Sequence, residues 1–132
     1  GLQDPIVQLG SLDSVRTFQD ARDAVRAYYL LALEAELGNV PSGEAFNIAG
    51  DESFKLTDVV QLMLDMSSRD DIEVATSVDR LRPIDADYQM FDNSKIKATI
   101  RWKPEIKVAS MFQDLLDYWR QQIREGRVPL NR

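Results

Sequence analysis

Apolar side chains recur every three to four residues in three stretches of the chain, and this spacing predicts three main helices. Between these stretches, apolar and polar residues alternate in shorter runs, which is typical of strands. A short fourth helix is expected to open at an Asp-Asn-Ser-Lys sequence and to end before a Trp-Lys-Pro stop. The predicted helices cover 19–38, about 56–66, about 92–99 and 108–124.

Capping residues refine the ends of these helices. We expect Asp20 to cap the first helix, with Asp23 three residues later as its capping-box partner. Gly38 is placed to take the left-handed conformation that ends a helix. Lys55 stands where the second helix needs a capping hydroxyl, so that start is expected to be weaker by about 1 kcal/mol.

Three strands are predicted, over 6–9, 44–50 and 72–76. In the middle one, Phe46 and Ile48 alternate with polar or small residues, and Gly50 ends the run in a tight loop. Strands that alternate with helices indicate an α/β fold. Three strands make a thin sheet, so we expect these elements to complete a larger fold.

Composition excludes several kinds of chemistry. The chain has 132 residues and a formal net charge of −6, and it contains no Cys and no His. Disulfides, imidazole bases and zinc sites built on sulfur or imidazole are therefore excluded, and no metal site is predicted. The acidic charge disfavours nucleic acid as a partner. The longest apolar run, 27–33, is far shorter than the roughly 20 residues of a membrane span, so no membrane partner is expected. The missing cysteines favour a cytoplasmic location.

Few sequence motifs suggest binding chemistry. Gly38 and Gly43 are spaced as in a phosphate-binding loop, but Glu44 and Ala45 replace the Lys and Ser/Thr that such a loop needs, so we expect only a turn. No Gly-x-Gly-x-x-Gly sequence occurs that would hold a dinucleotide. The aromatic residues and methionines are expected to pack in the core rather than form a stacking surface. These residues are Tyr28, Tyr29, Met63, Met66, Trp102, Met111, Tyr118 and Trp119.

Arg82 and Asp85 are the strongest candidates for a binding pair. They flank Pro83, so a stiff loop presents a guanidinium and a carboxylate together. The planar fork of an arginine suits a phosphate, and a carboxylate accepts hydrogen bonds from sugar hydroxyls, so the pair can hold a nucleotide. The alternative is a surface ion pair worth at most about 1 kcal/mol. Arg16 precedes the first helix, where an arginine commonly caps the helix or stays solvated.

Six sequence segments, taken in order, resemble the extended short-chain dehydrogenase/reductases that act on nucleotide sugars. The chain is most similar to the GDP-mannose 4,6-dehydratases and their companion reductases, and the resemblance runs from about Val7 to Arg120. No single segment is decisive, and the resemblance rests on the order and spacing of all six. The segments are Gly10-Ser-Leu-Asp-Ser-Val-Arg16, 18–28, Phe46-Asn-Ile-Ala-Gly50, Arg82-Pro-Ile-Asp85, Asp92-Asn-Ser-Lys95 and Trp102-Lys-Pro104.

This resemblance implies that residues 1–132 form the carboxy-terminal, substrate-binding portion of such an enzyme. Late Rossmann strands and a small substrate-binding subdomain are implied, while the NAD(P)-binding and catalytic part would lie upstream. Arg16 and Arg82 resemble the family arginines that grip the nucleotide diphosphate, and Asp85 resembles the residue that accepts the ribose hydroxyls. Ser11 replaces the asparagine commonly found after the glycine, so its substrate contact is open. The implied partners are a GDP-sugar, NADP or NAD in the complete enzyme, and further copies in a homo-oligomer.

Three functions remain open from the sequence. The first is a GDP-mannose 4,6-dehydratase, a lyase that removes water from the hexose. The second is the related GDP-4-keto-6-deoxymannose reductase or another epimerase of the family, since 78–83 and 114–119 resemble the reductase at least as well. The third is a binding or assembly module without catalysis. The isolated chain is expected to be inactive in each case, with no catalytic or cofactor-binding residue assigned to it.

Overall fold

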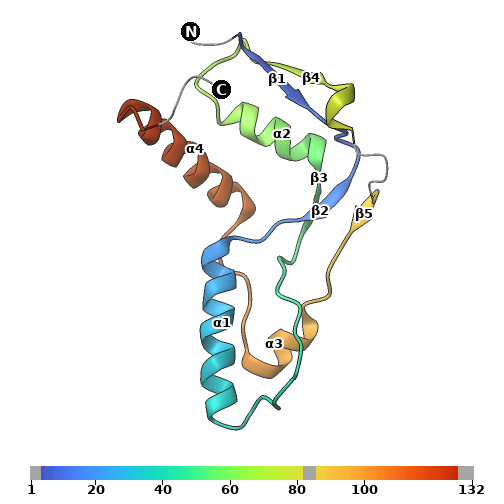
Figure 1. Ribbon diagram of the computed structural model, residues 1–132, viewed down its shortest axis with the longest axis vertical. Coiled ribbons are helices and arrows are strands. Elements are labelled where there is room, and N and C mark those ends of the chain that lie inside the picture. Colours follow the sequence, from blue (N-terminus) through green and yellow to red (C-terminus); the bar gives the residue numbers. More distant parts are fainter. Residues whose placement is uncertain (1–3, 82–85, 128–132) are drawn as a thin grey trace.

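The computed structural model describes residues 4–81 and 86–127, which form two small sheets and four α-helices (Figure 1). Strand β1 (Ile6–Leu9) pairs in parallel with β4 (Glu73–Thr76), with Ile6 opposite Glu73. A parallel pair requires a crossover connection, which here contains β2, α1, β3 and α2. A 3-10 turn, Val78–Arg80, follows β4.

The second sheet has three strands, with β2 (Val15–Thr17) in the middle. Strand β3 (Ser53–Lys55) pairs with it antiparallel, and β5 (Tyr88–Gln89) pairs with it in parallel. Figure 1 shows this sheet joining the upper part of the molecule, with β1 and β4, to the lower part with α1 and α3. Residues from three distant parts of the sequence therefore meet at β2.

The hydrophobic core lies between α1 (Ala21–Glu36) and α3 (Ser94–Ile100). Its fully buried side chains include Ile96 and Trp102, and the Trp102 indole N–H donates to the carbonyl of Asp23 at 3.0 Å. Burying an indole is favourable only when its N–H finds such a partner. The complete cluster comprises Ala27, Ile96, Ile100 and Trp102, packed against Leu30, Leu31, Val40, Phe46 and Ile48.

The last helix, α4 (Val108–Arg124), contacts α2 (Leu56–Asp65). The Arg120 guanidinium donates to the Met66 carbonyl at 2.7 Å, which satisfies a free carbonyl at the end of α2. Phe112 on α4 is buried and meets Phe18 edge-on, with the ring centroids 5.4 Å apart. None of the helices in the two described ranges is long and apolar enough to cross a membrane.

The predicted helices and their caps are confirmed with few changes. Asp20 caps α1 by accepting the backbone N–H of Arg22 at 2.8 Å, and Gly38 has a φ of +78°. Lys55 precedes α2 without a side-chain capping bond. The Asp23 capping box is wrong, because its carboxylate turns inward to the loop after α3.

The strand predicted over 44–50 is also wrong. These residues form neither helix nor ladder. Instead, Phe46 and Ile48 pack against the core, and Gly50 approaches β2 so closely that an added Cβ would lie 2.1 Å from the Phe18 carbonyl oxygen. The alternating pattern therefore reflects side-chain burial without strand pairing.

Several aromatic side chains predicted to lie in the core are exposed. Trp102 is buried as expected, but Tyr28 and Tyr29 on α1 are 62% and 63% exposed. Tyr118 and Trp119 on α4 are also about half exposed. The chain presents 9831 Å² of surface, against about 7,100 Å² expected for a compact protein of its mass. Apolar faces of α1 and α4 contribute to this excess.

Candidate substrate-binding site

Arg16 lies in the middle of β2, with a neighbouring strand on each side. Its cross-strand partners are Phe54 on β3 and Gln89 on β5. Paired residues of adjacent strands project from the same face of a sheet, so these three side chains share one face. The Arg16 side chain is half-buried, and its Nη1 donates to the Val15 carbonyl at 2.9 Å.

The position of β2 is fixed by hydrogen bonds to two other segments, one on each side. The Val15 N–H donates to the Asp87 carbonyl at 2.8 Å, and the Leu56 N–H donates to the Ser14 carbonyl at 3.0 Å. The hydroxyls of Thr17 and Ser53 lie 2.9 Å apart. Because hydrogen bonds hold the backbone on both sides of Arg16, the arginine side chain extends from a rigid strand.

An aromatic cluster lies next to Arg16 on the same face of the sheet. Phe18 directly follows β2 and contacts Phe54, which projects from the same face as Arg16. Its ring meets Phe54 at 6.4 Å and Phe112 at 5.4 Å, both edge-on. An apolar wall beside a guanidinium lowers the local dielectric, which strengthens its attraction for an anion.

Ser11 lies in the loop between β1 and β2, where its hydroxyl accepts the backbone N–H of Asp13 at 3.4 Å. It is exposed, and its contact is local to the loop. Arg82 and Asp85 lie outside the described residues. The described chain resumes at Ala86, immediately before Asp87, whose carbonyl binds β2.

A hollow of about 650 Å³ lies beyond the end of β5. Asn93 is buried at its edge and donates to the Ala49 carbonyl at 2.8 Å and to the Asp51 carboxylate at 2.7 Å. The Lys97 ammonium also binds Asp51 and, with Asn93, holds the pKa of that carboxyl below its usual range, although partial desolvation acts in the opposite direction. The hollow is lined by Gly50, Asp51, Met90, Phe91, Asp92, Asn93 and Lys97.

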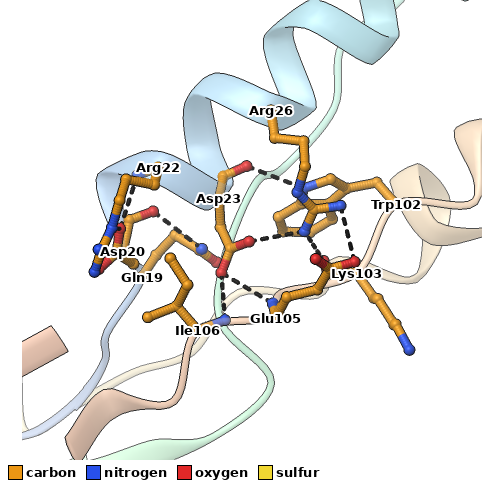
Figure 2. Close-up of polar contacts among 9 residues, drawn as sticks. All are labelled: Gln19, Asp20, Arg22, Asp23, Arg26, Trp102, Lys103, Glu105 and Ile106. Atoms are coloured by element: carbon orange, nitrogen blue, oxygen red, sulfur yellow. Dashed lines mark hydrogen bonds and ion pairs between the residues drawn. The ribbon is translucent and has the colours of Figure 1, made fainter. Parts of the chain in front are cut away.

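A buried carboxylate ties the start of α1 to the loop after α3 (Figure 2). Asp23, only 2% exposed, accepts the backbone N–H groups of Glu105 and Ile106, each at 2.9 Å. Its other oxygen accepts Arg26 Nη2 at 2.7 Å, and the same nitrogen donates to the Lys103 carbonyl at 2.6 Å. Sequence reasoning gave Asp23 only a local role, since the backbone groups that it binds, those of Glu105 and Ile106, are about eighty residues away.

The charge of Asp23 is stabilised by these donors. Burial alone raises the pKa of a carboxyl, but the hydrogen bond from Arg26 and the two backbone N–H groups outweigh it and lower the pKa of Asp23. Asp23 therefore stays ionised and holds α1 in place. Since α1 follows β2 after three residues, this contact also helps to fix the segment that carries Arg16.

Gly10 and Gly50, the two glycines that follow or precede strands near the candidate site, do not offer a cradle for a dinucleotide. Other backbone segments pack directly against Gly10 and Gly50 and leave no room for a ligand there. A Cβ added to Gly10 would lie 2.5 Å from the Arg80 carbonyl oxygen, and one added to Gly50 would lie 2.1 Å from that of Phe18. A nicotinamide cofactor would need the open strand-to-helix turn that holds a pyrophosphate, and these positions do not fit it. Across the described segments, no three acidic side chains gather to hold a metal ion.

The fold is that of the extended short-chain dehydrogenase/reductases. The structure of RMD from Pseudomonas aeruginosa complexed with NADPH matches with a TM-score of 0.77 and 21% identity, over 91% of this chain and 37% of that chain. UDP-glucose 4-epimerase from Thermotoga maritima with UDP-glucose matches with a TM-score of 0.74 and 21% identity, over 92% and 36%. A Bacillus anthracis dTDP-glucose 4,6-dehydratase in complex with NAD matches at 0.69 and 18% identity, over 88% and 34%.

The sequence places the chain in one family within this class. The family model described as GDP-mannose 4,6 dehydratase matches residues 1–115, and the chain belongs to this family. It is also 26% identical over 125 residues to GDP-6-deoxy-D-mannose reductase of Pseudomonas aeruginosa, covering 95% of this chain and 39% of that protein. The chain thus spans about two fifths of that relative's length. The predicted family and fold class, the carboxy-terminal part of an extended short-chain dehydrogenase/reductase, are confirmed.

Proposed function

We propose that this chain is the substrate-binding portion of an NAD(P)-dependent enzyme that acts on a GDP-sugar. In this proposal Arg16 and Arg82 bind the diphosphate, and Asp85 accepts hydrogen bonds from the ribose. Two guanidinium groups supply charge-assisted, bidentate hydrogen bonds, which neutralise a diphosphate and orient the hexose. Ser11 is proposed as a weaker contact at the edge of the same site.

The placement of Arg16 is the main support for this proposal. It is a half-buried arginine on a fixed central strand, beside an aromatic wall, in a chain of net charge −6. The segment that carries Arg82 and Asp85 leads into β5, which pairs with β2 at Arg16. The proposal requires the Arg16 and Arg82 guanidinium groups to converge on one diphosphate, with the Asp85 carboxylate at the adjoining ribose.

The reaction we propose first is that of a GDP-mannose 4,6-dehydratase, supported by the family model that covers residues 1–115. Its test is to incubate the complete protein with GDP-mannose and NADP or NAD, and to analyse the products. A 4-keto-6-deoxy sugar is expected. If GDP-mannose is bound but returned unchanged, the dehydratase assignment is wrong.

The second candidate is the GDP-4-keto-6-deoxymannose reductase, which the similarity to the Pseudomonas aeruginosa reductase favours. The same protein is then given the keto sugar together with NADPH or NADH. Consumption of the reduced cofactor with this substrate, without turnover of GDP-mannose, identifies the reductase. A protein that binds GDP and turns over neither sugar would instead be a binding module.

The remaining parts of the proposal concern the complete protein. Neighbouring structures are complexes with NADPH or NAD, so we propose that the complete enzyme uses a nicotinamide cofactor, which supplies hydride transfer when bound. Because Gly10 and Gly50 do not fit its pyrophosphate and the sequence has no Gly-x-Gly-x-x-Gly, we propose that residues outside this chain hold the cofactor. A homo-oligomeric assembly is proposed on the family relationship alone.

Substitution of the two arginines tests the site independently of the reaction. We expect Arg16→Ala and Arg82→Ala in the complete protein each to weaken GDP binding by about 1.5 to 3 kcal/mol, the value of a hydrogen bond to a charged group. Arg124→Ala, in the exposed last turn of α4, is the matched control and should leave the affinity unchanged. Equal affinities for all four proteins would show that neither arginine contacts the nucleotide.

A further inference from the structure

Gln89 occupies the position on β5 that faces Arg16 across the parallel pairing. The register sets Arg16 beside Gln89 and Val15 beside Tyr88. Neighbouring strands lie about 4.8 Å apart, and paired residues project to the same face. The Gln89 amide therefore stands next to the Arg16 side chain, on the same face of the sheet, while Tyr88 points to the other face.

The surroundings of Gln89 leave its amide available to a ligand. Its side chain is exposed and has no hydrogen-bond partner among the residues in the described ranges. β5 is an edge strand of the three-stranded sheet, so no further strand of that sheet covers it. Arg16 thus has the aromatic ring of Phe54 on one side and the amide of Gln89 on the other.

We propose that Gln89 is a second binding residue for the diphosphate held by Arg16. The inference rests on the proposed function, because it assigns a further contact within the same site. The side-chain amide donates an N–H to a phosphate oxygen, while Arg16 supplies the charge. A neutral amide adds a directional hydrogen bond without further positive charge, so it contributes orientation more than raw attraction.

Two substitutions in the complete protein separate the charge effect from the hydrogen bond. Gln89→Glu keeps the length of the side chain but places a carboxylate beside the phosphates, and Gln89→Leu removes the hydrogen bond without adding charge. The matched control is Gln8→Glu, a similarly exposed glutamine on β1 in the other sheet. The dissociation constants of GDP and of inorganic pyrophosphate are measured by calorimetry for each variant.

We expect Gln89→Glu to weaken the binding of GDP and of pyrophosphate at least tenfold, and by about the same factor, because each ligand contains the diphosphate group. Gln89→Leu should weaken both about threefold to tenfold, and Gln8→Glu should change neither. If the Gln89 variants bind both probes as the native protein does while Arg16→Ala binds them weakly, this inference is overturned and the proposed function stands. If the native protein and Arg16→Ala bind GDP with equal affinity, the proposed function and the inference about Gln89 are both wrong.

Discussion

Replacing Asp23 by Asn tests whether one buried carboxylate holds α1 against the loop after α3. The asparagine keeps the shape of the side chain but has a single acceptor oxygen. If that oxygen accepts the N–H groups of Glu105 and Ile106, the new NH₂ group faces the Arg26 guanidinium, and two donors confront each other. The substitution therefore removes at least one charge-assisted hydrogen bond from a site that is 2% exposed.

The expected loss of stability follows from these contacts. A hydrogen bond to a charged group contributes about 1.5 to 3 kcal/mol, and breaking a buried ion pair costs about 3 to 5 kcal/mol. Arg26 is 32% exposed and retains the Lys103 carbonyl and Glu105, so the lower part of this range applies. We expect Asp23→Asn to lower the free energy of unfolding by about 2 to 3 kcal/mol. Urea unfolding should then shift its midpoint by about 1 to 2 M.

Asp114→Asn is the matched control for this experiment. Asp114 also pairs with an arginine, Arg22, but both side chains are more than half exposed, so the same substitution should cost little. Unfolding is followed by tryptophan fluorescence, since buried Trp102 donates to the Asp23 carbonyl. If the two variants lose stability equally, or Asp23→Asn loses less than about 1 kcal/mol, the argument from burial is refuted.

The pH dependence of the stability that Asp23 contributes gives an independent check. The pKa of Asp23 is lowered from its ordinary value of 3.8, so its ionised form is stabilised by folding. This contribution is fully present above the ordinary value and is lost as pH falls through the lowered pKa of the folded state. The stability difference between native protein and Asp23→Asn should therefore be largest near neutral pH and shrink below pH 3.8.

Two further predictions concern the backbone. Gly50→Ala should destabilise the protein by about 1 to 3 kcal/mol in urea unfolding, because its Cβ would lie 2.1 Å from the Phe18 carbonyl oxygen. Gly126→Ala, with φ at +66° but nothing within 4 Å, should cost only about 1 kcal/mol, and the reverse order would contradict the steric argument. Arg101→Gly should raise the melting temperature by up to about 4 °C, because Arg101 ends α3 at φ 53°. Arg101→Ala should bring no such gain, and equal melting temperatures for both variants would show that no backbone strain is relieved.

The candidate site could be predicted only in part. Arg16 became a candidate only through the family resemblance, and its strand was not predicted, because β2, β3 and β5 have three residues or fewer and form only through pairing with distant segments. Gln89 carries no sequence signal of its own. Its place beside Arg16 follows from the register of β5 on β2, which a local pattern does not encode.

The sequence by itself determined the helices, the caps at Asp20 and Gly38, and the family. These features depend on residues a few positions apart, so the periodicity of α4 predicted the bounds Val108–Arg124 that the structure has. Only the tertiary structure decided that Asp23 binds a loop about eighty residues away, that 44–50 packs on the core without strand pairing, and that Tyr28 and Tyr29 face outward. Local spacing fixes which side chains share a face, whereas the partner that covers that face is set by contacts between distant parts of the chain.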